Sequence, residues 1–174
     1  MGSIDADTLK ILQTKLPQFM PNTQCQMMPK SITIPLNAYS PARKQYHSTL
    51  ILKEILTQTQ SLDTDKLLGI TDVDLFVPQL NFVFGEAECP GKVAIISTYR
   101  LRPEFYGNNP DAKLFELRII KEAVHELGHT LGIVHCKKPR CVMFFSNDIG
   151  DTDFKQATPC SDCLRKLNAA IASN

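Results

Sequence analysis

The histidines and cysteines of this 174-residue chain constrain its fold most strongly, because their distribution is uneven. Three of the four histidines and four of the six cysteines lie between His125 and Cys163. Imidazole and thiolate groups that gather in one short segment are typical metal ligands. The remaining residues of these types, His47, Cys25 and Cys89, are scattered over a part that we interpret as scaffold and substrate-facing surface. We therefore expect the chemistry to lie in the C-terminal third.

The segment from His125 to His129 has the form H-E-x-x-H. In a helix, residues i and i+4 lie on one face, so both imidazoles can reach one ion. Gly132 can adopt a positive φ and end the helix, which lets His135 turn back to the same metal. A bare H-E-x-x-H often occurs by chance and binds nothing, but Gly132 and His135 at the required offsets argue against that alternative.

Three neutral imidazoles leave the fourth position of a tetrahedral zinc ion to water, which is typical of a catalytic site. Zinc lowers the pKa of such a water toward about 7 and polarises a carbonyl group. We expect Glu126 beside this water rather than on the metal, as the general base that later passes the proton to the leaving amine. The motif thus predicts hydrolysis at a catalytic zinc site, and it specifies the nucleophile rather than the substrate.

Four cysteines follow as two close pairs, Cys136 with Cys141 and Cys160 with Cys163. Four thiolates can hold zinc in a saturated and therefore structural site. The alternatives are redox chemistry of the C-x-x-C pair or two disulfides, but no βαβ unit precedes the pair and nothing indicates export. Neighbouring side chains in an extended segment point to opposite sides, so His135 and Cys136 can each serve a different metal.

Charge and composition exclude several classes of partner. The chain has 19 Lys and Arg against 18 Asp and Glu, a net charge of +1, without the long basic runs that nucleic-acid or anionic-membrane binding needs. Charged residues between Met1 and Lys15 interrupt any signal peptide or membrane span. We therefore expect a cytoplasmic protein without nucleic-acid or membrane partners. With 43% hydrophobic residues it can bury the core of a single domain.

The sequence before the motif predicts a strand, a helix and three further strands. A β-branched run predicts a strand over 31–36. Ser40-Pro41 is typical of a helix start, and we expect that helix to end near Thr59. The further strands are expected over 70–77, 81–86 and 92–101. The last two are expected to pair antiparallel.

A long helix is expected to carry the motif, from the start signal Asn109-Pro110 to about Leu131. Its expected apolar stripe consists of Leu117, Ile120, Val124, Leu127 and Leu131. His125 and His129 lie about 120 to 160° around from the stripe, so they can face a cleft. After Gly132 we expect an irregular cysteine-rich segment and a closing helix over 161–172.

These motifs resemble those of the archaemetzincins, metzincin-like zinc peptidases whose three-histidine motif continues directly into cysteine, then C-x-M, then C-x-x-C. They stand here as HELGHTLGIVHC, CVM and CSDC. The resemblance implies an α/β (α+β), metzincin-like fold with an N-terminal mixed twisted sheet with helices, an active-site helix and a small irregular zinc-stapled C-terminal lobe. It also implies one metallopeptidase domain over 1–174, with an upper lobe to about 131 and a lower lobe from about 132.

The resemblance implies two zinc ions per chain and a role for each motif residue. The catalytic zinc would be bound by His125, His129 and His135, with Glu126 as the base. The structural zinc would be held by Cys136, Cys141, Cys160 and Cys163. Met143 would be the Met-turn methionine that packs beneath the metal site.

Two features of substrate handling stay open. An exposed strand can pair with an extended peptide, and for this we favour 82–86, although an ordinary sheet strand fits the sequence equally well. Some metzincins have a tyrosine two residues after the Met-turn methionine, where this chain has Phe145. Tyr99, Tyr106 or an arginine could stabilise the oxyanion instead.

The leading hypothesis is a zinc-dependent metallopeptidase that acts on peptide or protein substrates. A zinc amidase or deacylase acting on small amides would use the same residues. A non-catalytic, zinc-stabilised binding module is a third reading, and the intact Glu126 argues against it. The natural substrate, endo- or exopeptidase action and the oligomeric state are left open.

Overall fold

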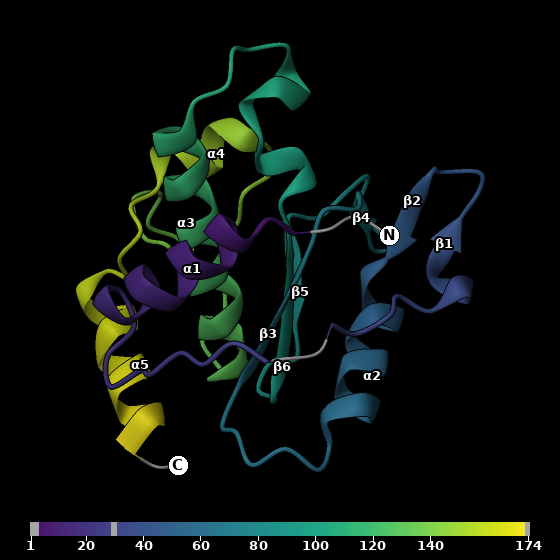
Figure 1. The fold of residues 1–174 in the computed structure, drawn as a ribbon. Helices are drawn as coiled ribbons and strands as arrows, with labels where there is room; N and C mark the ends of the chain where they lie inside the picture. Colours follow the sequence, from purple (N-terminus) through teal and green to yellow (C-terminus); the bar gives the residue numbers. More distant parts are fainter. Residues whose placement is uncertain (1–3, 29–30, 173–174) are drawn as a thin grey trace.

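The computed structural model describes residues 4–28 and 31–172, and a small mixed sheet between two helices lies at its centre (Figure 1). Its strands, in spatial order, are β3 (Leu67–Thr71), β6 (Val93–Ser97) and β5 (Gly85–Ala87). The central β6 is parallel to β3 and antiparallel to β5. Helix α2 (Ser48–Thr59) covers one face and helix α3 (Ala112–Thr130) covers the other.

The side chains of β6 alternate between two hydrophobic clusters. Val93 and Ile95 pack on the α2 side with residues such as Ile51. Ile96 packs on the α3 side with residues such as Ile120. All five residues of β6 are buried, because helices cover both faces of the strand. The sheet therefore joins the two clusters into one core.

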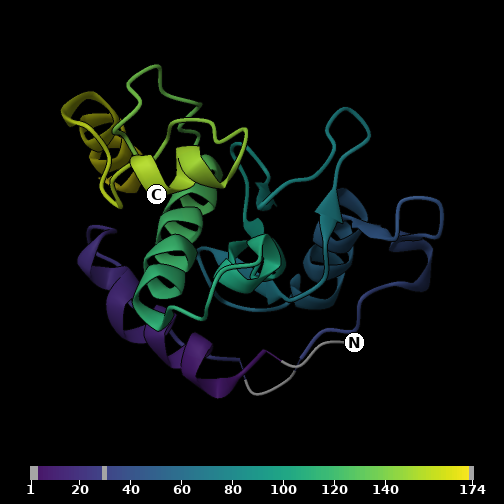
Figure 2. The same cartoon turned by 90° about the horizontal axis from the view of Figure 1, so that it is seen from above.

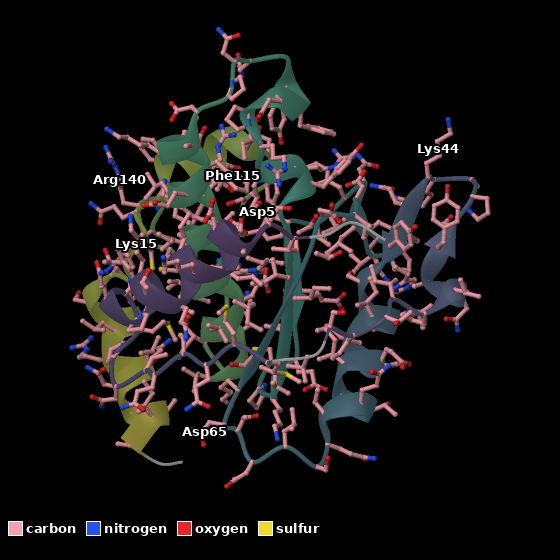
Figure 3. The ribbon with its side chains drawn as sticks, viewed as in Figure 1. Asp5, Lys15, Lys44, Asp65, Phe115 and Arg140 are labelled. Atoms are coloured by element: carbon pink, nitrogen blue, oxygen red, sulfur yellow. The ribbon has the colours of Figure 1, made fainter. Side chains whose placement is uncertain are left out.

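A second, smaller sheet leads into α2. It contains β1 (Tyr39–Ser40), β2 (Gln45–His47) and β4 (Leu75–Phe76), in the order β1-β2-β4. Strand β2 is antiparallel to β1 and parallel to β4. Lys44, with φ of 56°, lies at the tip of the loop that joins β1 to β2 (Figure 3).

Helix α1 (Ala6–Lys15) and the 3-10 turn η1 (Leu16–Gln18) lie along α3. Leu12 and Leu16 are buried in the same cluster as the apolar side of α3. Lys15, at the end of α1, forms an ion pair with Glu116 of α3 (Figure 3). Seen from above, α1 lies on one side of α3 and the C-terminal segments on the other (Figure 2).

The chain after α3 is largely irregular. It contains α4 (Ile149–Phe154) and α5 (Ser161–Ala172), with a parallel bridge between Cys136 and Phe144. The closing helix expected over 161–172 is confirmed. No strand follows α3 in the part of the chain that the structure describes. None of the described helices is long and apolar enough to cross a membrane.

The strand expected over 31–36 is wrong. Described backbone there is irregular and ends in the 3-10 turn η2 (Leu36–Ala38). A β-branched run favours extended backbone, but a strand also needs a neighbour to pair with, and no described strand pairs with this segment. Ile34 is nevertheless buried with the α2 cluster. The apolar pattern thus marked a core contact rather than a strand.

Several expected boundaries shift because tertiary pairing overrides local signals. The helix expected from Ser40-Pro41 begins at Ser48, since 45–47 form β2, although it ends at Thr59 as expected. The strand expected over 70–77 is divided between β3 and β4, which belong to different sheets. The strand expected over 92–101 ends at Ser97 and is followed by the 3-10 turns η3 (Tyr99–Leu101) and η4 (Pro103–Tyr106). The expected antiparallel pair is confirmed as β5 with β6.

Helix α3 begins two residues later than the proline signal indicates. Asp111 caps it by accepting a hydrogen bond from the Leu114 amide at 3.0 Å. The expected stripe is buried at Ile120, Val124 and Leu127, whereas Leu117 is 40% exposed. From residue 118 to 128 the helix is buried on all sides, because the sheet, α1 and the C-terminal segment surround it.

Two substitutions on α3 test whether the stability of the helix follows the burial seen in the structure or the apolar stripe expected from the sequence. Ile120→Ala removes a side chain that is 2% exposed, so it should lower the free energy of unfolding by about 2–5 kcal/mol. Leu117→Ala, at the exposed position, should cost about 1 kcal/mol or less. Chemical denaturation of the two variants beside the wild type measures both, and equal losses would contradict this packing.

Candidate functional site

Three histidines meet at the C-terminal end of α3. His125 and His129 lie one turn apart on the helix, and His135 comes from the segment after it. The Nε2 atom of His129 lies 3.1 Å from that of His125 and 3.2 Å from that of His135. Zinc bound tetrahedrally at about 2.0–2.1 Å from each nitrogen would need a spacing of about 3.3 Å. The donor set therefore fits a zinc ion.

Backbone carbonyls orient two of the imidazoles. The Nδ1 atom of His125 lies 2.8 Å from the Val142 oxygen, and that of His129 lies 2.7 Å from the Ile133 oxygen. A carbonyl oxygen only accepts, so each Nδ1 must carry the proton, which leaves the Nε2 lone pair free for a metal. The tautomer and the ring orientation are thus both set by the backbone.

Burial keeps these imidazoles neutral. It lowers the pKa of His125 well below its ordinary value. Burial, followed by the neighbouring His135, lowers the pKa of His129 to about 4, and burial also lowers the pKa of His135. Because the neutral ring is the form that binds metal, all three residues are ready to act as ligands near pH 7.

The turn that brings His135 back follows from Gly132, which has φ of 81° as expected. Its amide donates to the His129 oxygen at 2.8 Å, and the Ile133 amide donates to the Gly128 oxygen at 3.1 Å. These two bonds form a Schellman motif, which needs a left-handed residue at the position of Gly132. The helix therefore ends sharply after the second histidine.

Glu126 lies against the edge strand β5. A Cβ atom at Gly85 would come within 2.6 Å of the Glu126 Cγ and 2.8 Å of its Oε1, so only glycine permits this approach. Burial raises the pKa of Glu126 well above its ordinary value, and the negative charge of Glu122 adds to this effect. A carboxylate with a raised pKa is a better proton acceptor than an exposed one.

A cleft of about 370 Å³ opens above these residues. Its lining includes all three histidines and Glu126, together with the residues of β5, Phe82 and Phe145. Because β5 is an edge of its sheet, its outer backbone groups can pair with an extended chain in the cleft. The edge strand expected over 82–86 is thus found at 85–87.

The residues suggested for the oxyanion do not line the cleft. Tyr99 is exposed, and the Tyr106 hydroxyl donates to the Arg100 carbonyl at 2.9 Å. Arg100 is itself paired with Asp74 through two bonds of 2.6 and 2.8 Å. Among the described residues, neither a tyrosine nor an arginine lines the cleft.

Met143 packs beneath the histidines. Its side chain is 1% exposed, and a Cβ atom at Gly128 would lie 2.5 Å from its sulfur. Gly128 lies between Glu126 and His129 on α3, so the methionine fills the space under the motif. Its carbonyl oxygen also accepts a hydrogen bond from the Cys136 amide at 2.8 Å.

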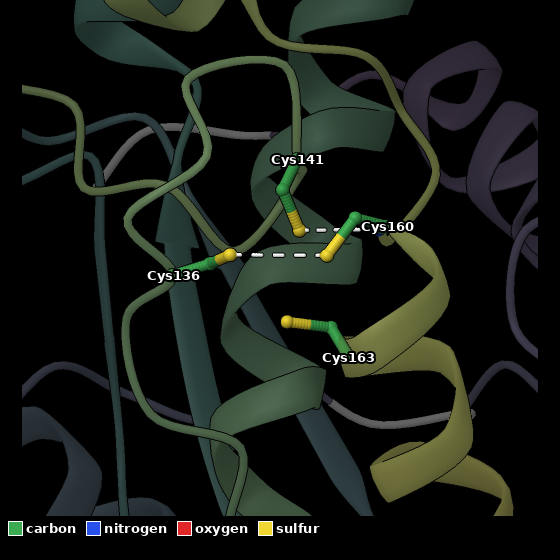
Figure 4. A group of neighbouring side chains, drawn as sticks. All are labelled: Cys136, Cys141, Cys160 and Cys163. Atoms are coloured by element: carbon green, nitrogen blue, oxygen red, sulfur yellow. Dashed lines mark hydrogen bonds between the residues drawn. The ribbon is translucent and has the colours of Figure 1, made fainter.

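The four cysteines form a second cluster beside α5, with their sulfur atoms turned toward one another (Figure 4). All four are free thiols, and their sulfur atoms lie within 4.8 Å of one another. The Cys136 and Cys160 sulfurs are 3.8 Å apart, far beyond a disulfide bond. A tetrahedral zinc ion with bonds of about 2.3 Å needs a sulfur spacing of about 3.8 Å. This donor set also fits zinc, and His135 and Cys136 enter separate clusters as expected.

Sequence reasoning missed Gly85, Gly128, Glu122 and Lys155. Gly85 interrupts a strand pattern, and such a glycine often marks a close approach, so a signal was present. Glu122 lies one turn before Glu126 on α3 and also lines the cleft. Lys155 lies 29 residues beyond Glu126 in an irregular segment, and nothing in its sequence context marks it.

Comparison with known proteins assigns the chain to one peptidase family. The model of peptidase family M54 matches residues 19–169. The archaemetzincin of Methanocaldococcus jannaschii is 47% identical, over 96% of this chain and 89% of that protein. The archaemetzincin of Pyrococcus furiosus is 41% identical, over 98% of this chain and 91% of that protein.

Solved structures agree with this result. The crystal structure of archaemetzincin from Methanopyrus kandleri has a TM-score of 0.83 and 32% identity, covering 99% of this chain and 91% of that one. The archaemetzincin from Archaeoglobus fulgidus, complexed with malonate, has a TM-score of 0.78 and 38% identity, covering 94% of both chains. A zinc-dependent peptidase from Methanocorpusculum labreanum has a TM-score of 0.78 and 30% identity, covering 94% and 92%.

The approach of β5 to Glu126 can be tested at Gly85. Gly85→Ala should displace the carboxylate and lower kcat/KM on a peptide by about a hundredfold. Its Cβ would also meet the Ile95 carbonyl oxygen at 2.6 Å, so the thermal stability of the variant is measured beside its activity. Gly69→Ala is the matched control, since its Cβ meets only the flexible end of Ile55 at less than 3 Å, on the α2 side of the same sheet. Equal activity in the two variants would show that Gly85 does not position Glu126.

Proposed function

The chain is a zinc-dependent metallopeptidase of family M54, the archaemetzincins, and we propose that it cleaves peptide bonds with Glu126 as general base and with two zinc ions per chain. His125, His129 and His135 would hold the catalytic zinc. Cys136, Cys141, Cys160 and Cys163 would hold the structural zinc. The observation that carries this proposal is the close spacing of three Nε2 atoms on the floor of a cleft that Glu126 also lines.

A zinc ion in the histidine site would polarise the scissile carbonyl and lower the pKa of a water molecule in the open position. Glu126 would accept the proton of that water and deliver it to the leaving amine, since a buried carboxylate with a raised pKa can do both near neutral pH. Gly85 would keep β5 close enough to confine this carboxylate.

The substrate would lie along β5 as an added strand. The outer edge of this strand borders the cleft, and its main-chain groups can align a peptide past the histidines. Membership of a peptidase family favours peptides and proteins over small amides as substrates. Assays of unstructured peptides beside small aryl amides would separate a peptidase from an amidase.

The cysteine site would act on the histidine site through the backbone. Cys141 is followed by Val142, whose oxygen orients His125, and Cys136 follows His135. A saturated four-thiolate zinc would hold this irregular segment, and with it a lower lobe from about residue 132, against the upper lobe that ends near 131. A reducing compartment such as the cytoplasm would keep the thiols available.

Metal content tests the two sites. Elemental analysis of the purified, zinc-equilibrated wild type should give two zinc ions per chain. The His125→Ala/His129→Ala double variant should keep one. Cys160→Ser should lose the structural zinc and unfold more readily, because metal binding there contributes to folding. Two zinc ions in the double variant would refute the histidine site.

Glu126→Ala tests the base. The variant should keep both zinc ions and lose at least a thousandfold in kcat, because the group that accepts the proton is gone. Glu116→Ala is the control, on the same helix but paired with Lys15 away from the cleft, and should retain activity. Hydrolysis at the wild-type rate by Glu126→Ala would eliminate this mechanism.

A further inference from the structure

Charged side chains are buried where α3 meets α4. Four of them are at most 4% exposed, namely Arg118, Lys121, Glu122 and Lys155. Removing charges from water is costly, so such groups are kept only where each has a partner or a use. Their partners therefore show which of them attach α4 and which do something else.

Arg118 and Lys121 attach α4 to α3. Arg118 forms a bidentate pair with Asp153 at 2.8 and 2.7 Å. Lys121 donates to the Thr152 and Asp153 carbonyls at 2.9 and 2.8 Å, near the end of α4. These contacts satisfy both cations and hold the helices together.

Lys155 and Glu122 are arranged differently. The Lys155 Nζ lies 2.9 Å from Glu122 Oε1, but makes no hydrogen bond of acceptable geometry with a described residue. The Thr152 hydroxyl donates to the same carboxylate oxygen at 3.1 Å. The ion pair and the Thr152 hydroxyl thus hold the Glu122 carboxylate toward α4.

Glu122 is also a neighbour of the proposed base. It lies one turn before Glu126 on α3, and both residues line the cleft. Two carboxylates at this spacing repel each other. Lys155 is paired with Glu122, which lines the cleft, so the ammonium group lies directly behind a cleft carboxylate.

We propose that Lys155 is a positioning residue for the peptidase reaction: its ion pair holds Glu122 against α4 and out of the open position beside the histidines, so that Glu126 is the carboxylate left to face the substrate. This inference rests on the proposed function. Glu122 lies three residues before His125 on α3 and lines the same cleft, so a released carboxylate would be free to turn toward the imidazoles. Zinc accepts such an oxygen as a ligand. The site would then be closed to water.

A purely mechanical role explains Lys155 less well. Arg118 and Lys121 already connect the two helices, with better hydrogen bonds. A buried ion pair is also a weak source of stability, since apolar residues of similar volume often serve as well. Control of a carboxylate in the cleft gives the pair a use that those contacts do not supply.

The test compares three variants of the full chain with its cysteine site loaded. The affinity of the histidine site for zinc is measured by competition with a chelator, and kcat is measured on a peptide. Lys155→Met should bind zinc about tenfold more tightly and lose at least tenfold in kcat, because Glu122 is freed. Glu122→Gln should bind zinc about tenfold more weakly, because the Lys155 charge is left uncompensated. The Lys155→Met/Glu122→Gln double variant should return to within about threefold of the wild type in both.

Lys121→Met is the matched control, because it removes a buried ammonium at the same interface whose hydrogen bonds go to backbone carbonyls rather than to Glu122. This variant should destabilise the fold and leave the zinc affinity of the histidine site within about threefold of the wild type. Shifts of the same sign in Lys155→Met and Glu122→Gln would overturn the proposal. If Lys155→Met does not fold, weaker binding in Glu122→Gln with recovery in the double variant supports it, and no recovery overturns it. Failure of the proposed function is distinguishable, since the wild type would then bind no zinc at its histidines or cleave no peptide.

Discussion

The hydrogen bond between the His125 imidazole and the Val142 carbonyl joins the two halves of this site. His125 belongs to a part of α3 that is buried on all sides, whereas Val142 belongs to the irregular segment after that helix. The flanking residues give Val142 its place, since Cys141 enters the thiol cluster and Met143 packs under Gly128. The orientation of a histidine on the helix thus depends on a cluster of thiols that never touches it. The segment has little regular secondary structure, and its order comes from side chains such as Val142 and Met143 that are buried in the same core as α3.

Both clusters were predictable from spacing because ligand geometry is a local matter. Two imidazoles four residues apart on a helix, a glycine that reverses the chain and a third histidine define a site whatever the rest of the fold does. The four cysteines follow the same logic. The strand expected over 31–36 failed for the opposite reason, since a strand exists only where a distant segment pairs with it. Helix α2 begins at Ser48 rather than near Ser40, because the residues directly before it form strand β2.

Contacts across long separations were the least predictable part of the site. Gly85 is 41 residues from Glu126 in the sequence. The need for a residue without a side chain there follows only from the packing of β5 against α3. Lys155 is similar, because it directly follows α4 and its partner Glu122 lies 33 residues earlier on α3. Residues that can bind a metal are recognised in the sequence by their side-chain chemistry. Residues that position a metal ligand or a base are recognised only from their place in the folded structure.

The adjacency of His135 and Cys136 has a consequence for how chains of this kind can diverge. One extra residue at this junction would turn one of the two side chains to the wrong side of an alternating backbone. Both centres would then be damaged by a single event, although each has several other donors. Insertions in the short turn over 146–148, before α4, carry no such penalty, because it holds no donor of either cluster and none of the residues that attach α4 to α3. Over evolutionary time, length variation should therefore accumulate in that turn while the junction itself stays invariant in length.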